Sequence, residues 1–586
     1  MKKILKIALT AVTLTLFSCE DALDKFPLDK LSPETNFSSA TELQLFSNQF
    51  YTMFPGGSSI YGESADNIVT SEIPLAVRGG RVVPTTGGGW SWENLRSVNT
   101  LLYYSNNCKD MEVRNRYDAL ARFFRAYFYF DKVKDFGDVP WIDHPLGSAE
   151  ETLYGVRDSR ELVMTNILAD IDFAITYLPQ TKDAYRVTKW TALALKSRIC
   201  LFEGTFRKYH NITLPGNGSE YYLGLAAEAA ETFMLNSGYK LYSTGTAPYR
   251  DLFASLTPFT DEIILCRDYN IGLGQSHSAN NYTISTSMGR PGLTKKIVNS
   301  YLMSDGTRFT DKVGYGTMLF KDECLNRDPR LAQTIRTPGY TRIGATVKLA
   351  PGFTSTLTGY QPIKYVMAST YDEYNKSYND LPLFRTAEVY LNFAEAKAEL
   401  GTLTQTDIDN SIKKIRDRAR MPNLNMAAAN ANPDPYLMAR ETGYPNVTGS
   451  NKGVILEIRR ERSIELIMEG FRYDDMMRWR EGKAFEQPFF GLYIPGPGTY
   501  DLDGNGTNDV CFYEGTKPAA FVSLFLKIGQ DVFLSEGNKG FIDPHGSNAR
   551  IWLEDRDYLN PVPIQDRTLT KGKLTQNPGW VDGLDF

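Results

Sequence analysis

The sequence predicts a mainly α-helical protein in which stacked helical hairpins are joined to a large loop-rich region. Apolar residues recur at intervals of three and four through several segments of the first half, a period typical of amphipathic helices. Between about residues 238 and 380 this period gives way to Gly, Pro, Ser, Thr and Tyr, which favours loops and short strands such as 262–266. The helical segments of the first half are 41–54, 94–108, 111–134, 159–178, 189–206 and 222–236.

The helical pattern returns after the loop-rich region, at 383–400, 406–419, 454–469 and 472–482. Small residues such as Ala226, Ala229 and Ala230 form a narrow stripe on segment 222–236, which suits close helix packing. Paired helices with such stripes predict a tetratricopeptide-like stack, although no strict repeat period is present. The Gly-, Pro- and Asp-rich stretch 487–586 is predicted to wrap this body as largely irregular structure.

The N-terminus predicts export and lipid anchoring. An apolar run over residues 4–17, flanked by lysines, is too short to cross a bilayer and predicts a signal peptide over residues 1–18. The run ends in LFSC, similar to a bacterial lipobox, so we expect acylation of Cys19 and a tether over residues 19–40 that holds the chain on a membrane lipid. The alternative is a secreted protein in which Cys19 has no such role.

Charge and cysteine content argue against two classes of protein: nucleic-acid-binding proteins and proteins held together by a disulfide framework. The formal net charge is −5 at pH 7, which disfavours nucleic acid as a partner. The five further cysteines are widely spaced and odd in number, so they form no disulfide framework. Free thiols are expected for most of them, and one bridge between an unspecified pair stays open. Aromatic residues make up 12% of the chain, a surplus that a binding surface would explain.

No common signature of nucleophilic, zinc or phosphoryl chemistry occurs in the sequence. Four carboxylates instead recur every fourth residue along one predicted helix: Glu457, Glu461, Glu465 and Glu469. We expect them to form an ion-pair network with arginines such as Arg472, Arg478 and Arg480, since catalytic carboxylates project into a cleft rather than line a helix. The sequence therefore predicts no catalytic residue and no required cofactor.

One loop matches the first nine positions of a calcium-binding loop, with Gly506 at the sixth position. Position 12 is Phe512, where a bidentate glutamate is expected. Two interpretations stay open: a structural calcium site, or a Gly/Asn-rich turn leading into a strand at 510–513. The candidate metal ligands are Asp501, Asp503, Asn505, Thr507 and Asp509.

Several segments, in the same order along the chain, together resemble the SusD/RagB family of outer-membrane nutrient-binding lipoproteins. They are CEDALDKFP at 19–27, RAYFYF at 125–130, DFGDVP at 135–140, LPLFRTAEVYL at 381–391, ERSIEL at 461–466, EGFRY at 469–473, YLNPVP at 558–563 and QNPGW at 576–580. The resemblance implies a superhelix of about four tetratricopeptide-like hairpins, with an N-terminal helical region over 41–240 and a C-terminal region over 241–586. The loop-rich part is expected to carry the ligand site.

The same resemblance implies a role. A lipoprotein on the outer membrane, facing the cell exterior, would bind oligomeric nutrients and deliver them to a SusC-like TonB-dependent β-barrel transporter. The nutrient is a glycan in most members and a peptide in some. Two rivals remain: a surface glycoside hydrolase, and a tetratricopeptide-type adaptor that binds other proteins.

A glycan site needs aromatic faces beside polar groups, and several loops offer both. Trp90 is the better platform, whereas Trp92 is expected in the core. For each aromatic residue, packing is the alternative to ligand contact, and the two arginines could equally bind loop carboxylates. The candidate ligand-binding residues are Asp66, Arg78, Arg81, Trp90, Asn281, Tyr282 and Tyr315.

Overall fold

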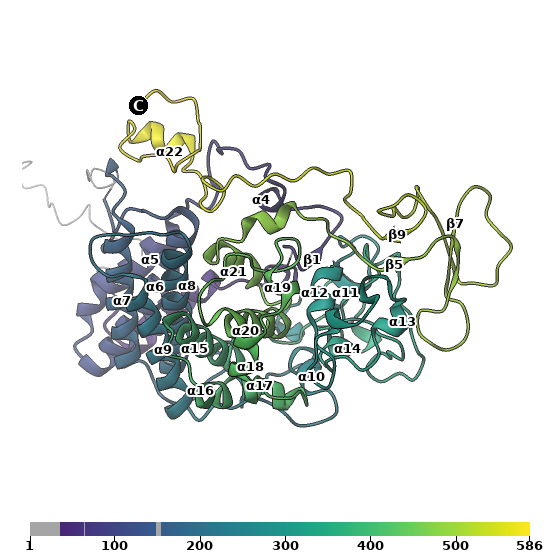
Figure 1. The fold of residues 1–586 in the computed structure, drawn as a ribbon. Helices are drawn as coiled ribbons and strands as arrows, with labels where there is room; N and C mark the ends of the chain where they lie inside the picture. The colour runs from purple at the N-terminus through teal and green to yellow at the C-terminus, as the bar shows by residue number, and fades with distance from the viewer. Residues whose placement is uncertain (1–35, 64, 148–153) are drawn as a thin grey trace, which may run out of the picture.

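The computed structural model describes residues 36–63, 65–147 and 154–586. The predicted signal peptide, Cys19 and most of the tether lie outside these residues. No helix in the described ranges is both long and apolar enough to span a membrane. The predicted mainly helical fold is confirmed, with the helices gathered on one side and the loop-rich half on the other (Figure 1).

The helical layer contains every segment predicted in the first half. Polar side chains cap the N-termini of its helices. Asp110 accepts hydrogen bonds from the backbone N–H groups of Glu112 and Val113 at the start of the helix 111–136, and Ser159 caps the helix 160–177. The elements are α2 (Ala40–Ser47), η2 (Asn48–Met53), α5 (Glu93–Tyr104), η3 (Ser105–Asn107), α6 (Met111–Phe136), α7 (Arg160–Tyr177), α8 (Lys189–Tyr209) and α9 (Ser219–Asn236).

The stack continues into the second half of the chain. Helix α8 packs on α9, and α9 packs on α15 (Thr386–Leu400), which in turn contacts α20 (Lys452–Glu465). A Cβ atom at Gly204 of α8 would lie 2.7 Å from the side chain of Leu223 of α9, so only glycine permits this close approach. Helices far apart in sequence thereby form one layer.

The remaining helices of the second half are short. The predicted helix 406–419 is broken at Ser411, whose hydroxyl donates to the carbonyl oxygen of Asp407 and whose backbone leaves the helical region. The two pieces and the elements that follow are α16 (Gln405–Asn410), α17 (Ile412–Arg418), α18 (Met426–Ala431), α19 (Pro435–Met438), α21 (Arg472–Arg478) and η9 (Gly482–Glu486).

The loop-rich half contains two small antiparallel sheets. Strand β2 (Ile263–Arg267), at the predicted position, pairs with β4 (Leu381–Arg385), and β1 (Ile68–Val69) pairs with β3 (Gly292–Leu293). The helices around them are α3 (Ser58–Tyr61), α4 (Leu75–Arg78), α10 (Pro248–Ala254), η5 (Ile271–Leu273), α11 (Ala279–Ile284), α12 (Lys295–Ser300), η6 (Phe309–Asp311), η7 (Tyr315–Thr317), α13 (Phe320–Glu323), α14 (Leu331–Thr334) and η8 (Ser369–Tyr371).

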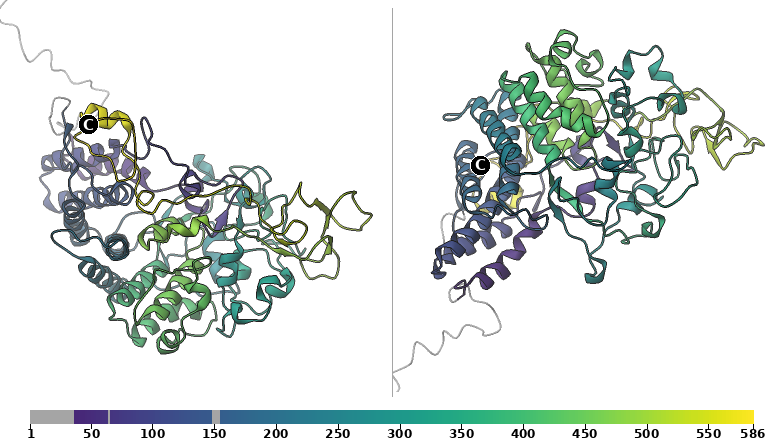
Figure 2. Two further views of the ribbon diagram at one scale, coloured as in Figure 1. Left: turned by 45° about the horizontal axis from the view of Figure 1, so that its top comes forward. Right: turned by 90° about the horizontal axis from the view of Figure 1, so that it is seen from below.

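The C-terminal stretch forms a lobe of strands that projects away from the helical layer in all three views (Figures 1 and 2). From this lobe the chain returns across the molecule to α22 (Ile564–Leu569), which shares a pocket with residues of α5. The strands are β5 (Tyr493–Ile494), β9 (Gly540–Phe541), β6 (Gly498–Tyr500), β7 (Val510–Tyr513) and β8 (Leu524–Lys527); β5 pairs with β9, β7 is antiparallel to β6 and β7 is parallel to β8.

The glutamates of α20 form the predicted ion-pair network, which is buried, and their partners differ from the predicted arginines. Arg330 and Arg416 bind Glu461 at 2.5 and 2.8 Å, and Arg385 binds Glu465 at 2.7 Å. These arginines come from distant segments of the chain, which sequence spacing cannot identify.

The three arginines named as partners have different roles. Arg472 binds Asp66, Arg478 binds Glu395, and Arg480 pairs with Glu554. The Arg472 and Arg478 pairs are buried, so breaking either one leaves a buried charge without its main partner, whereas the Arg480–Glu554 pair is partly exposed. The five described cysteines are all free, so the structure has neither a disulfide framework nor the single bridge left open from the sequence among its described residues: Cys108, Cys200, Cys266, Cys324 and Cys511.

Candidate ligand-binding groove

The pairing of β1 with β3 brings two polar loops together and forms an open groove. Ile68 lies opposite Leu293 and Val69 opposite Gly292, and beyond the strands the backbone N–H of Ser71 donates to the carbonyl oxygen of Gly289 at 2.8 Å. Gly289 has a φ of +80°, a left-handed conformation that favours glycine. Loops 70–74 and 285–289 therefore run side by side.

The groove encloses about 500 Å³, within the range of small-ligand sites. Glu72 is the single carboxylate among the described residues that line it. Hydroxyl groups form much of the rim, and apolar side chains lie between them. The hydroxyl residues are Ser58, Ser59, Thr70, Ser71 and Ser287, and the apolar residues are Pro74, Tyr282 and Met288. Such a surface can donate and accept hydrogen bonds around an apolar face.

Tyr282, on α11, forms part of the floor. It is 7% exposed, and its ring lies 5.4 Å from that of Tyr61 on α3. Its buried hydroxyl makes no hydrogen bond to any residue that the structure describes. Burial, with the nearby carboxyl of Glu63, raises the pKa of Tyr282 above its ordinary value, so the hydroxyl is neutral at physiological pH.

Buried contacts hold the groove loop in place from below. The carboxylate of Asp66 accepts bonds from Arg472 at 2.6 and 2.7 Å and from Lys296 at 2.8 Å. His545 Nε2 donates to the carbonyl oxygen of Thr70 at 2.8 Å, and burial lowers the pKa of this histidine. Asp66 is 1% exposed, so it positions the loop instead of lining the groove.

The two predicted arginines differ in their surroundings. Arg78, the last residue of α4, is exposed. Arg81 donates to Asn560 Oδ1 at 2.6 Å and pairs with Asp557 at 3.3 Å, while its guanidinium lies 5.4 Å from the ring centre of Trp580. Arg81 thus binds a loop carboxylate, the alternative considered from the sequence, and attaches the C-terminal stretch to the body.

The exposure of the two tryptophans is the reverse of the prediction. Trp90 is 6% exposed with its ring 4.7 Å from Phe136, whereas Trp92 is half-buried. The turn formed by the three glycines at 87–89 brings Trp90 under the end of α6, which spacing alone cannot reveal. Both tryptophans line a separate pocket against α22.

The other two predicted residues also lie outside the groove. Asn281 Nδ2 donates to the carbonyl oxygen of Asp372 at 2.9 Å. Tyr315 is half-buried and meets Tyr436 edge-on at 6.3 Å, in another surface pocket. Of the predicted set, Tyr282 alone lines the groove, and a ligand role for any of them stays a prediction.

The groove hydroxyls were absent from the predicted set. Ser58 and Ser59 begin the short helix α3, and Ser71 and Ser287 lie in polar loops. The sequence around them carries no signal beyond Ser- and Gly-rich composition. Ser71 and Ser287 are brought together by the β1–β3 pairing, across more than two hundred residues of sequence.

The candidate calcium loop brings three carboxylates together, each with one oxygen within 4.8 Å of the others: Asp501, Asp503 and Asp509. Asn505 Oδ1 accepts from the backbone N–H of Thr507 at 2.7 Å, as in a polar turn, and Thr507 is exposed. Phe512 is buried in β7, so position 12 supplies no ligand oxygen. The predicted strand is confirmed, while the calcium site and the plain turn both stay open.

The stacked hairpins and the groove define the class of protein: a helical-repeat protein with an open polar groove formed by loops and short helices at 58–74 and 282–289. The chain belongs to the SusD family, which residues 262–580 match. Residues 90–201 also match a family described as "Starch-binding associating with outer membrane".

Individual relatives cover nearly the whole chain. SusD-like protein P2 of Formosa agariphila is 24% identical over 515 residues, which span 83% of this chain and 93% of the relative. A SusD-like protein from Bacteroides fragilis superposes with a TM-score of 0.67 at 20% identity, covering 95% of this chain and all of that one. A structure described as a laminarin-binding SusD-like protein has a TM-score of 0.53 at 18% identity, covering 92% of this chain and 99% of its own. This likeness shows a shared fold.

Proposed function

We propose that this chain binds a neutral oligosaccharide in the groove beside Tyr282 and delivers it to a SusC-like TonB-dependent transporter in the outer membrane. Acylation of Cys19 would anchor it there, facing the cell exterior. The observation that carries the proposal is the groove itself, whose hydroxyl rim and aromatic floor match the hydroxyl edges and apolar faces of a sugar.

The relatives favour a glycan over a peptide. Besides the laminarin-binding protein, a Bacteroides fragilis structure described as a SusD-like carbohydrate-binding protein superposes with a TM-score of 0.66 at 21% identity and covers 91% of this chain and 98% of its own. The single carboxylate of the groove, Glu72, gives little electrostatic preference for an ionised peptide. A neutral glycan therefore fits both the groove and the family.

The hydrolase alternative requires two carboxyl groups, typically about 5–9.5 Å apart, on either side of the scissile bond. Glu72 has no second carboxylate beside it among the described groove residues. The glutamates of α20, the other acidic array, are engaged with buried arginines. Capture without cleavage is therefore the better supported activity at this groove.

Titration calorimetry of the chain lacking residues 1–19 tests the binding step. The titrants are laminarihexaose, maltohexaose, cellohexaose, xylohexaose and mannohexaose, with a tetrapeptide pool as the contrast, and each mixture is chromatographed afterwards. We expect binding of a hexasaccharide that is recovered intact. Cleavage would establish the hydrolase instead, and binding of the peptides alone would overturn the glycan assignment.

A second experiment tests the anchor and the partner. The full-length chain and a Cys19→Ala variant are expressed in the native host, and proteins solubilised from the membranes are captured through a C-terminal affinity tag. We expect a large β-barrel transporter with the full-length chain and loss of membrane attachment with the variant. Recovery of soluble scaffold proteins without a barrel would favour the adaptor alternative.

A further inference from the structure

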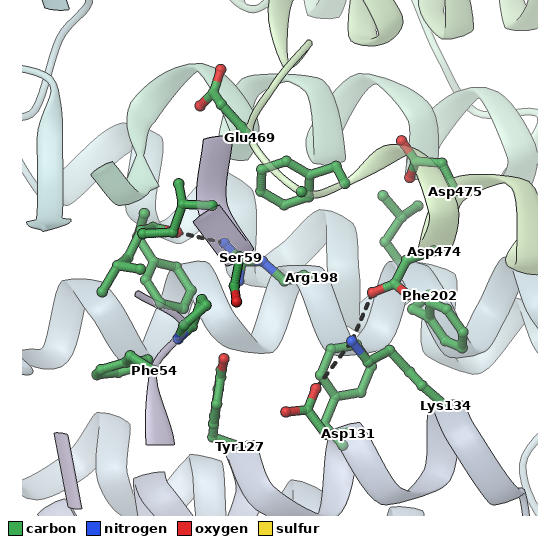
Figure 3. A pocket seen from close by; sticks show the side chains of 18 of the residues that line it. Phe54, Ser59, Tyr127, Asp131, Lys134, Arg198, Phe202, Glu469, Asp474 and Asp475 are labelled. Atoms are coloured by element: carbon green, nitrogen blue, oxygen red, sulfur yellow. Dashed lines mark hydrogen bonds and ion pairs between the residues drawn. The ribbon is translucent and has the colours of Figure 1, made fainter. Parts of the chain in front are cut away.

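A second hollow, of about 330 Å³, lies next to the groove, between the helical layer and the C-terminal half (Figure 3). Ser59 of α3 lines both hollows, so the two are neighbours across this short helix. Aromatic rings from both halves of the chain wall the pocket: Phe54, Tyr127, Phe130, Phe202, Phe384 and Phe471.

Two polar side chains that line this pocket each have a hydrogen-bonding group that is not used by the described residues. Tyr127 is 9% exposed, and its hydroxyl, which points into the pocket in Figure 3, makes no hydrogen bond to any described residue. Arg198 lies 4.0 Å from the ring centre of Phe384 and 5.0 Å from that of Phe471. Its Nε and Nη2 atoms donate to Glu388 at 2.6 and 2.7 Å, which leaves Nη1 without a partner in the described structure.

The pocket as a whole has balanced charge. Lys134 bridges Asp131 at 3.0 Å and Asp474 at 2.7 Å along one wall, as Figure 3 shows. Four basic and four acidic side chains line the pocket in all, so no net charge selects an ion. Aromatic faces beside fixed hydrogen-bond donors and acceptors suit a neutral ring with many hydroxyl groups. The volume of the pocket is near the lower limit of the volumes found for small-ligand sites.

We infer that this pocket binds the terminal one or two sugar rings of an oligosaccharide whose remaining rings lie in the groove. The inference rests on the proposed function and extends it, because a pocket of this size beside an open groove would make the protein select chain ends. Tyr127 and Arg198 are the residues assigned to contact the terminal ring, and Ser59 would contact the chain as it passes between the two hollows.

Tyr127→Phe tests the inference, since the substitution removes one hydroxyl and keeps the ring that lies 5.1 Å from Phe54. Tyr117→Phe is the matched control, a buried tyrosine on the same helix that does not line this pocket. With the hexasaccharide that binds most tightly in the panel above, we expect Tyr127→Phe to weaken binding about three- to tenfold and the control to leave it unchanged.

A crystal structure of the same complex provides a second readout that does not depend on a variant. We expect one or two sugar rings against Tyr127, with the rest of the chain over Ser59 and Tyr282. Sugar rings in the groove alone, with unchanged affinity in Tyr127→Phe, would overturn the inference and leave the proposed function standing. If no hexasaccharide binds the unsubstituted protein, the proposed function fails and the inference fails with it.

Discussion

Asp66 and Arg472 are 406 residues apart in the sequence and form a buried ion pair beneath the groove, with Nε–Oδ1 and Nη2–Oδ2 distances of 2.6 and 2.7 Å. Burial alone would raise the pKa of Asp66, but the charges of Arg472 and Lys296 outweigh it and hold that pKa below its ordinary value. The pair ties the loop between α3 and β1 to the start of α21.

Asp66→Ala leaves Arg472 buried without its main partner, and we expect a loss of about 3–5 kcal/mol in the free energy of unfolding. Urea unfolding followed by circular dichroism measures it. The control is Glu536→Ala, whose exposed pair with Lys539 spans 3.7 Å and is expected to change stability by less than about 0.5 kcal/mol. Equal stability of the two variants would contradict the role given to Asp66.

Glu63 lies beside Tyr282 under the groove and predicts a pH-dependent stability. Its Oε2 accepts from the backbone N–H of Met468 at 3.0 Å, while Oε1 has no partner among the described residues. Burial raises the pKa of Glu63 to about 7 from an ordinary 4.5. Because the folded state binds this proton more tightly, the stability that the protonated group contributes is fully present below about pH 4.5 and is lost as the pH rises through about 7.

The Glu63→Gln variant has no ionisable group at this position. Between pH 5 and pH 8, the free energy of unfolding of the variant should therefore fall less than that of the unsubstituted protein. We expect the variant to be more stable at pH 8 by about 2–3 kcal/mol, from the size of the pKa shift. Urea titrations at both pH values measure this, with exposed Glu72→Gln as the control. An identical pH dependence in Glu63→Gln and the unsubstituted protein would show that Glu63 is not the group responsible.

The two interpretations of the loop at 501–509 predict different responses to calcium. A bound cation would relieve the repulsion among Asp501, Asp503 and Asp509, so millimolar calcium should raise the melting temperature, and Asp503→Asn should abolish that rise. A plain turn predicts the same melting temperature in calcium and in chelator. Differential scanning calorimetry of both proteins, with magnesium as the comparison ion, decides between them.

The helical layer was largely predictable because its signal is local. Segments such as 111–134 and 189–206 carry their period and capping residues within a few turns, and α6 and α8 begin within a residue of the predicted positions. The break at Ser411 was missed, since an isolated serine inside a helical period gives no clear stop signal.

The groove was not predictable in the same way, because its parts meet only through long-range contacts. Tyr282, one of the predicted ligand-binding residues, does line the groove, and its ligand role stays a prediction. Ser71 and Ser287 come together only when β1 pairs with β3. Trp90 was predicted to be the exposed platform because Trp92 was expected in the core of its helix, whereas the glycine turn carries Trp90 beneath α6. Tyr127 stands in a family segment that reads as core, and its free hydroxyl shows only in three dimensions.

The measurement that tests the central claim most directly is hexasaccharide binding by Ser71→Leu, with Ser243→Leu as the matched control. Both serines are exposed, but only Ser71 lines the groove. The account predicts that Ser243→Leu binds like the unsubstituted protein, and that Ser71→Leu, which loses a hydroxyl and fills the groove, binds at least about tenfold more weakly. Equal affinity of all three proteins would contradict capture in this groove.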